Sequence, residues 1–242
     1  MINQYKIPLA EMADRFPPAA AYSLYAALLE QLPPETAAEI HDSQSAFISQ
    51  YLEGGFWHLS LLGDFSSESL SELPGHIRLK KWDCLLLLPE ECRIPRSISD
   101  AETFLTERKN RFWTLRFHTP TAFKSAGSYQ LLPTSRLLLQ SLMQKWNCCF
   151  PDCVIEDEGM GLEAMAEGLV CHSVRLSSRS YPLKRNLIPG ITGELRIENK
   201  LNGFHRILAD ALLEFGNYSG VGIKTSLGMG GFTAIQERRE KI

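Results

Sequence analysis

The stretch Phe112–Asn147, FWTLRFHTPTAFKSAGSYQLLPTSRLLLQSLMQKWN, decides the fold because it contains two different hydrophobic repeats. Up to Thr119-Pro120, large apolar residues occupy every second position, which predicts a β-strand. After Thr134, which suits a helix N-cap, apolar residues recur every four positions and predict an amphipathic helix. The residues that carry the two repeats are Trp113, Leu115 and Phe117, and then Leu138, Leu142 and Trp146.

The remainder of this half repeats the same alternation of strands and helices. We expect strands at 169–176 and 192–197, separated by a loop that contains Pro182 and Pro189-Gly190. Phe204–Phe215 has the apolar spacing of an amphipathic helix, Gly216 suits its C-cap, and 232–235 predicts a final strand. The order strand, helix, strand, strand, helix, strand is typical of a ferredoxin-like (RRM-like) α+β domain.

The first half permits the same order less clearly. We expect a strand at 3–9, a helix over 19–32 after Pro17-Pro18, and a short helix over 35–40. Further strands are expected at 56–62 and within 77–88, and a helix from Ser99 or Asp100 to about Arg108. With 242 residues the chain is long enough for two cores, so we predict two tandem ferredoxin-like domains, 1–110 and 111–242.

The charge is distributed unevenly along the chain. The composition, 44% apolar and 22% charged, excludes disordered, coiled-coil and collagen-like chains, and the net charge is −3. Residues 1–110 hold nine basic against sixteen acidic side chains, whereas residues 111–242 hold sixteen against twelve. Two basic stretches, 111–146 and 172–206, predict a cationic groove for a polyanion if they share one face. From charge alone, solvated faces of an ordinary enzyme remain the alternative.

Other sequence signals point to a soluble chain without a cofactor. The first ten residues do not resemble a secretory signal, and the apolar run Cys84–Leu88 is too short for a membrane helix, so we expect a cytoplasmic protein without membrane contact. None of the six cysteines forms a C-x-x-C pair, so we expect free thiols and no metal site.

The most unusual segment is Ser219–Gly231, SGVGIKTSLGMGG, with five glycines in thirteen residues. Ile223 stands where a P-loop requires glycine, and Thr225 stands where a dinucleotide fingerprint does. Two interpretations remain from the residues themselves: a nest of backbone N–H groups that binds an anion, or a long hairpin that needs unusual dihedral angles.

This segment, extended to Phe232, resembles the C-terminal glycine-rich signature of the CRISPR-associated repeat endoribonucleases, the Cas6 group of the repeat-associated RNA-binding superfamily. Three more segments resemble the family in the same order, and the first half does so more loosely, through Tyr25 and the stretch from His41-Asp42 to Phe47. The three segments are Leu115–Phe123, Leu131–Asn147 and Ile188–Ile197. The resemblance implies two ferredoxin-like domains and metal-independent cleavage of CRISPR precursor RNA within its repeats.

Cleavage without a metal uses the substrate's own 2′-hydroxyl as nucleophile and leaves a 2′,3′-cyclic phosphate and a 5′-hydroxyl. It needs a base, an acid and donors for the charged phosphorane. The resemblance places the catalytic histidine at His41 and an assisting tyrosine at Tyr25. Family members with a complete triad have a lysine a few residues after the histidine, but here the stretch is Ser43-Gln44-Ser45-Ala46. We expect Lys124, Lys184 or Arg185 to supply that charge, or the enzyme to be slow.

The predicted partner is CRISPR repeat RNA, both precursor and mature guide. Other CRISPR effector subunits and a second copy of the chain are further candidate partners. An alternative function is a catalytically weak subunit that holds guide RNA, and an unrelated small-molecule enzyme is disfavoured by the missing cofactor motifs. We expect the RNA contacts to come from basic side chains and loop glycines, namely Lys124, Lys184, Arg185, Gly220, Gly222, Lys224, Gly228, Gly230 and Gly231.

Overall fold

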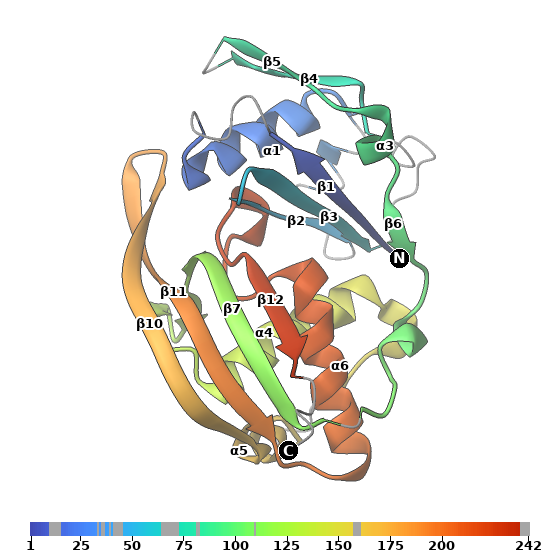
Figure 1. Ribbon diagram of the computed structural model, residues 1–242, viewed down its shortest axis with the longest axis vertical. Helices are drawn as coiled ribbons and strands as arrows, with labels where there is room; N and C mark the ends of the chain where they lie inside the picture. Colours follow the sequence, from blue (N-terminus) through green and yellow to red (C-terminus); the bar gives the residue numbers. More distant parts are fainter. Residues whose placement is uncertain are drawn as a thin grey trace.

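A computed structural model describes residues 1–9, 16–32, 34, 37–38, 40, 46–63, 73–80, 83–108, 110–156 and 161–237. Two four-stranded antiparallel sheets dominate it, one in each half of the chain (Figure 1). The first sheet contains β1 (Ile2–Pro8), β2 (Ala46–Glu53), β3 (Phe56–Gly63) and β6 (Arg96–Ile98). The second contains β7 (Phe112–Thr121), β10 (Leu169–Leu183), β11 (Asn186–Asn199) and β12 (Phe232–Gln236).

The second sheet has the strand order β12-β7-β11-β10, in which the first strand lies between the last and the third. Helices α4 (Ser135–Cys149) and α6 (Gly203–Ser219) lie behind it (Figure 1), and a shorter helix, α5 (Gly161–Gly168), precedes β10. The Thr134 hydroxyl accepts the Leu137 N–H, so the predicted N-cap of α4 is confirmed. This order is that of a ferredoxin-like domain, as predicted.

The first sheet has the equivalent order, β6-β1-β3-β2. Helix α1 (Ala21–Leu29) covers it after the 3-10 turn η2 (Pro18–Ala20), and buries Leu24 and Leu28 beside Trp57. Between β3 and β6, where a ferredoxin-like domain has its second helix, the described residues form the hairpin β4 (His76–Leu79) and β5 (Cys84–Leu87), followed by one helical turn, α3 (Glu90–Arg93). The predicted fold class, two ferredoxin-like domains, is therefore correct.

The two domains share part of one core. Ile2, Leu62 and Ile98 of the first sheet belong to the same buried cluster as the helices of the second domain. Phe104, in the connection between the sheets, packs edge-on against Trp146 and Phe215. The boundary predicted near residue 110 therefore lies within a connection that is itself anchored in the second core.

Two predicted elements differ from the structure, and one strand was not predicted. The helix expected from Ser99 or Asp100 to Arg108 is wrong: only the 3-10 turn η5 (Ala101–Thr103) forms, because burial of Phe104 draws the chain into the second core. Strand β2 was not predicted, because its buried residues include the polar Ser49 and Gln50. The loop expected between 176 and 192 is the long β10–β11 hairpin, which tolerates Pro182 on its edge strand.

The end of α6 also differs. Gly216, the expected C-cap, lies inside the helix, where an added Cβ would be 2.7 Å from the ring of Phe232. The helix ends at Gly220, which has a φ of +60°. Within the described part of the chain, no helix is both long and apolar enough to cross a bilayer.

Candidate active site

A cleft of about 870 Å³ lies where α1 meets the tip of the β10–β11 hairpin and the glycine-rich loop. Three residues that sequence reasoning selected line it together: Tyr25 from α1, Lys184 from the hairpin tip and Lys224 from the loop. These residues are separated by up to about two hundred positions in the chain, so only the fold brings them together. The other lining residues are Tyr22, Ala26, Leu29, Glu30, Tyr129, Leu183, Asn186, Leu187, Ile188 and Leu227.

Both lysines stand at sharp turns of the backbone. Lys184 and Lys224 each have a φ of +55°, a left-handed conformation that costs a non-glycine residue about 1–2 kcal/mol. Lys184 directly follows β10 at the hairpin tip, and its Nζ lies 5.4 Å from the centroid of the Tyr22 ring. Lys224 is exposed and begins the 3-10 turn η7 (Thr225–Leu227). The two turns present ammonium groups to the same cleft.

Tyr25 is half-buried, and burial raises the pKa of its hydroxyl, with a smaller contribution from Tyr22. The phenol is protonated at neutral pH, so Tyr25 is suited to donate a hydrogen bond to a phosphate oxygen. Glu30 also lines the cleft but is paired with Lys80, with 2.7 Å between Nζ and Oε2.

His41, the predicted catalytic histidine, lies outside the described residues, and so does the Ser43–Ser45 stretch that lacks a lysine. Its role stays a prediction. The neighbouring Ile40 is 7% exposed and belongs to the first core, together with Leu24 and Leu28 of α1.

The other predicted RNA-binding cations lie near the cleft without lining it. Arg185 is exposed at the hairpin tip, next to Lys184. Lys124 lines a separate groove of about 140 Å³ with Gln140, Gln144 and Gly222. Within the described residues, no ion pair engages any of Lys124, Lys184, Arg185 or Lys224.

The glycines of the loop are closely packed against the rest of the protein, and their predicted approach to RNA stays a prediction. Gly220, Gly228, Gly230 and Gly231 are buried, and only Gly222 is partly exposed. A Cβ on Gly228 would meet the Tyr181 hydroxyl at 2.4 Å and Ala21 at 2.5 Å, and one on Gly231 would meet the Tyr51 ring at 2.5 Å. The glycines therefore let the loop press against β2 and α1. This packing favours the second interpretation of the segment, a turn that needs unusual dihedral angles. Lys224 stays at the surface.

Two buried side chains fix α1 against this loop. The Gln50 amide Nε2 donates to Ala21 O at 2.8 Å and to Ser226 O at 2.7 Å, while its Oε1 accepts from Trp57 Nε1. The Tyr181 hydroxyl lies 3.1 Å from Pro18 O and 2.6 Å from Leu227 O. Polar side chains in these positions satisfy backbone carbonyls of both domains, and they hold Tyr25 and Lys224 at a fixed separation.

Lys145 holds the other end of the loop. Its ammonium donates to the carbonyls of Ser219 and Gly220, at 3.1 and 3.0 Å, where α6 ends. Burial lowers the pKa of Lys145 to about 7. This lysine from the first basic stretch is therefore a structural cap and does not contribute to a surface for RNA.

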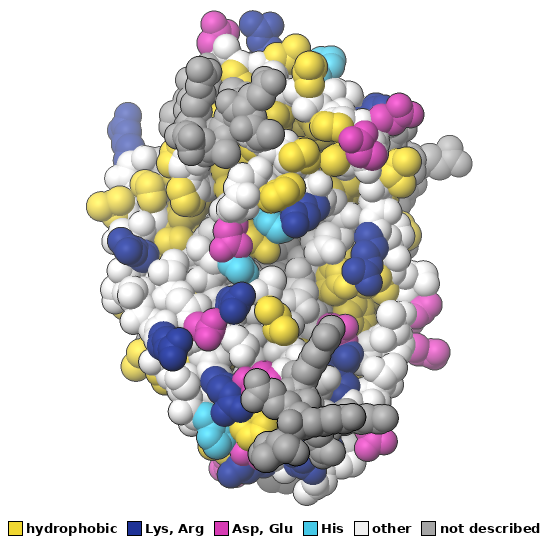
Figure 2. All heavy atoms as spheres, viewed as in Figure 1, with side chains coloured by type: hydrophobic (Ala, Val, Ile, Leu, Met, Phe, Trp, Pro, Cys, Tyr) yellow, Lys and Arg dark blue, Asp and Glu magenta, His cyan; other side chains and the backbone are white. Residues whose placement is uncertain are grey.

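Many other basic residues of the two stretches are paired within the protein. Arg116 binds Glu194, Arg196 binds Glu237 through two hydrogen bonds, and Arg136 binds Glu163. Figure 2 accordingly shows basic and acidic side chains intermixed over the sheet face of the second domain, with no single basic patch. Ion pairs within the protein therefore reduce the positive groove predicted from charge counts, although Arg175 and Arg179 stay exposed on β10.

Two histidines form an interdomain ring stack. The Tyr51 ring lies between His58 and His118, with centroids at 4.5 and 5.5 Å and nearly parallel planes. His118 Nδ1 lies 2.5 Å from Glu53 Oε1, and its Nε2 lies 2.8 Å from Thr233 Oγ1. Because both ring nitrogens of His118 are engaged, this histidine joins β7 to β2 and is not available as a general base.

The stack makes stability depend on pH. Burial lowers the pKa of His58 to about 4, with a further contribution from Lys6, so the folded protein excludes a proton that the unfolded chain binds below about 6.5. Unfolding free energy should fall by about 1–2 kcal/mol from this group between pH 6.5 and 4, after allowance for partial exposure. The carboxylate of Glu53, whose pKa the hydrogen bond from His118 lowers, loses its contribution only at lower pH. In urea unfolding, His58→Phe should lose less stability than the wild type over this window. If the free energy of unfolding falls equally over this pH range in the wild type and in His58→Phe, the assignment to His58 is contradicted.

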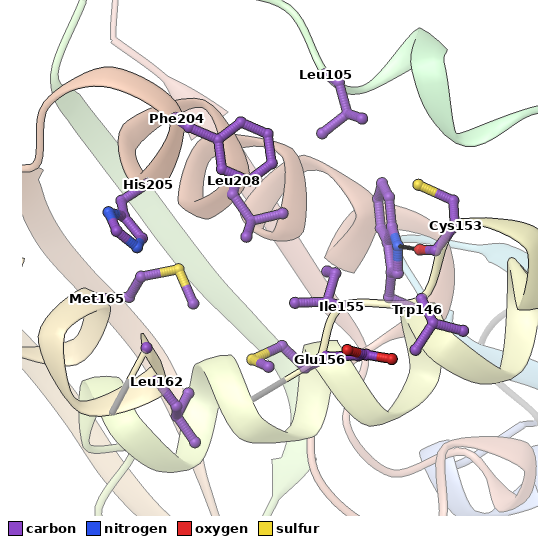
Figure 3. Close-up of a pocket in the computed structure, with 13 residues that line it drawn as sticks. Leu105, Trp146, Cys153, Ile155, Glu156, Leu162, Met165, Phe204, His205 and Leu208 are labelled. Carbon is purple, nitrogen blue, oxygen red and sulfur yellow. Dashed lines mark hydrogen bonds between the residues drawn. The ribbon is translucent and has the colours of Figure 1, made fainter. Parts of the chain in front are cut away.

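A second cavity, of about 250 Å³, lies between α4, α5 and α6. Figure 3 shows its mostly apolar lining, including Leu208 and Met165, and the Trp146 indole, which donates to Cys153 O at 2.8 Å. None of the predicted site residues lines it. Among the described residues, no three His, Cys, Asp or Glu side chains gather as a metal site would require.

Comparison with known proteins identifies the family. A family model described as CRISPR-associated endoribonuclease Cas6 matches residues 115–232. The CRISPR-associated endoribonuclease Cas6 of Streptococcus thermophilus is 32% identical over 229 residues, which cover 91% of this chain and 93% of that relative. This chain belongs to the Cas6 endoribonucleases. The resemblance described from the sequence is thereby confirmed, and so is the assignment as an endoribonuclease.

Other Cas6 proteins agree in sequence or in fold. The Cas6 of Mycobacterium tuberculosis is 35% identical over 131 residues, 54% of this chain and 41% of that protein. The structure of Thermus thermophilus Cas6 matches with a TM-score of 0.64 at 24% identity, over 97% of this chain and 98% of that one. A Cas6 product complex matches with a TM-score of 0.63, also at 24% identity and with the same coverage of both chains. At this identity the solved structures support the fold alone.

Sequence reasoning did not select Tyr22, Glu30 and Tyr129 in the cleft. Tyr22 was detectable as a tyrosine three residues before Tyr25, one helical turn away. Tyr129 was not detectable, because it lies in a short hairpin, β8 (Phe123–Ser125) and β9 (Ser128–Gln130), that the sequence pattern did not reveal.

Proposed function

We propose that this Cas6 protein cleaves CRISPR precursor RNA within its repeats without a metal ion, and that cleavage occurs at the cleft of Tyr25, Lys184 and Lys224. The substrate 2′-hydroxyl attacks the adjacent phosphorus, the bond to the 5′-oxygen of the next nucleotide breaks, and the products are a 2′,3′-cyclic phosphate and a 5′-hydroxyl. His41 transfers the proton as general acid or base. Its ordinary pKa of about 6.5 allows either form near neutrality.

The observation that carries the proposal is that Tyr25 and two lysines, which form no ion pair among the described residues, line one cleft. An in-line attack at phosphorus places extra negative charge on the non-bridging oxygens, and donors aimed at that charge lower the barrier. Lys184 and Lys224 supply positive charge that the Ser43–Ala46 stretch lacks. Solved relatives include a Cas6 substrate mimic complex and a Cas6 in which a histidine is replaced by alanine.

RNA outside the cleft contacts Lys124 and Arg185, which flank it on the β8–β9 hairpin and at the β10–β11 tip. Binding to other CRISPR subunits and formation of a homodimer stay predictions.

Incubation of the protein with its repeat RNA in excess chelator tests the mechanism. We expect cleavage at the same rate as without chelator. The product should carry a cyclic phosphate, which mass spectrometry detects. Substrate with hydrogen in place of the 2′-hydroxyl at the scissile nucleotide should bind and remain uncut, since the nucleophile is missing. Rapid cutting of that deoxy substrate would contradict internal attack and indicate hydrolysis by water. RNA that is bound but never cut would favour the alternative, a subunit that only holds guide RNA.

A further inference from the structure

The β8–β9 hairpin is a small rigid projection beside the cleft. Its turn, Ala126-Gly127, has φ values of +48° and +79°, as a two-residue hairpin turn with a left-handed pair requires. Its base is fixed, because Phe123 is 3% exposed and the N–H of Ile223 in the glycine-rich loop donates to Ala122 O at 2.9 Å. The three residues of β9 are all exposed.

Tyr129, the central residue of β9, offers a free aromatic ring to the cleft. The side chain is 47% exposed and lines the cleft with Tyr25, Lys184 and Lys224. Within the part of the chain that the structure describes, its ring makes no stacking or cation contact and its hydroxyl no hydrogen bond. Burial in the protein core therefore does not account for the position of this ring.

A cation stands directly opposite this ring. Lys124 on β8 pairs in register with Tyr129, so both side chains project from the same face of the hairpin. Lys124 also lines the smaller groove with Gln140 and Gln144. The consecutive residues Ile223 and Lys224 line the groove and the cleft respectively, so the two hollows adjoin along the hairpin.

An exposed aromatic face beside an unpaired ammonium is the chemistry that binds single-stranded nucleic acid, in which bases stack on rings and phosphates meet cations. We propose that Tyr129 stacks on the base of an unpaired nucleotide that adjoins the scissile phosphate, while Lys124 contacts the backbone as it enters the smaller groove. This inference rests on the proposed function and adds a base-binding subsite to its cleft.

The test compares Tyr129→Ala and Tyr129→Phe with the control Leu132→Ala, an exposed residue (73%) that does not line the cleft. Removal of an exposed side chain leaves the fold intact, which thermal unfolding verifies. Affinity is measured with repeat RNA that carries a 2′-deoxy scissile nucleotide. Tyr129→Ala should weaken binding about 5- to 100-fold, the range that loss of one base stack produces. Tyr129→Phe and Leu132→Ala should bind like the wild type, because stacking does not need the hydroxyl.

Abasic substitutions on either side of the scissile phosphate then locate the contact. At one position, loss of the base should weaken wild-type binding by the same factor as Tyr129→Ala and should not weaken the variant further. The inference is overturned if the abasic substitution and Tyr129→Ala weaken binding additively at every position, or if Tyr129→Ala binds like the wild type. In either case, cleavage of the 2′-hydroxyl substrate by the wild type would still support the proposed function. Failure of the wild type to bind or cut the repeat would overturn both.

Discussion

Replacement of His41 by alanine is expected to lower the single-turnover rate of repeat cleavage by about 10²- to 10⁴-fold, the usual contribution of a general acid or base. Affinity for the uncut RNA should change little, because one neutral imidazole contributes less to binding than the cations around the cleft. The rate is measured with enzyme in excess over labelled RNA, and the affinity with the 2′-deoxy substrate.

The matched control is His76→Ala, because His76 is exposed on β4, and β4 lies on the opposite side of α1 from the glycine-rich loop (Figure 1). It should cleave at the wild-type rate. If His41→Ala also cleaves at that rate, the proton transfer belongs to another group, and Tyr25 in the cleft becomes the first to test. Parallel loss of rate and affinity in His41→Ala would indicate a binding role.

Gly230→Ala is expected to destabilise the protein by about 3 kcal/mol or more, which corresponds to roughly 6–12 °C in Tm for a chain of this size. Gly230 has a φ of +69°, and an added Cβ would lie 2.1 Å from Val221 O. Hydrogen bonds hold both sides of the loop in place: Val221 N donates to Gly230 O at 3.0 Å, and Gly230 N donates to Pro120 O at 3.2 Å. Relief of the overlap therefore breaks hydrogen bonds between the loop and the sheet.

Gly127→Ala separates backbone strain from steric overlap. Gly127 also has a positive φ, +79°, but no atom lies within 4 Å of the added Cβ. Gly127→Ala should lower the free energy of unfolding by only about 1 kcal/mol. Urea or thermal unfolding of the two variants measures the difference. Similar losses in both would show that conformational strain dominates and that the loop has room at Gly230 after all.

The fold of the second domain was predictable from sequence because the hydrophobic pattern of its own helices and strands indicates which faces are buried. The apolar stripe of α4 and the alternation of β7 record burial against neighbouring elements of the same domain. The first domain was harder for a physical reason. Strand β2 is buried on both faces and contains the consecutive polar residues Ser49 and Gln50. The hydrogen-bond partners of Gln50 lie in α1 and η7, so the strand's sequence pattern looks polar until those partners are known.

The candidate site was predictable in part. Lys184, Lys224 and Tyr25 were selected separately, and the cleft joins them, but no periodicity indicated that the tip of one hairpin would face the first helix. The glycines were conspicuous in the sequence, and their approach to RNA stays a prediction. Their lack of side chains reflects close packing on Tyr51, Tyr181 and Ala21, which sequence alone cannot distinguish from approach to a ligand.

The shared interior of the two domains has a consequence for biosynthesis. Ile2 and Leu62 emerge from the ribosome well before the loop that covers Gln50 and before strand β12. The edge strand β2 of the first domain is therefore covered only after residues near 230 have been synthesised. A nascent chain halted before this point leaves that strand exposed, so translation past residue 230 and acquisition of the cleft are coupled events.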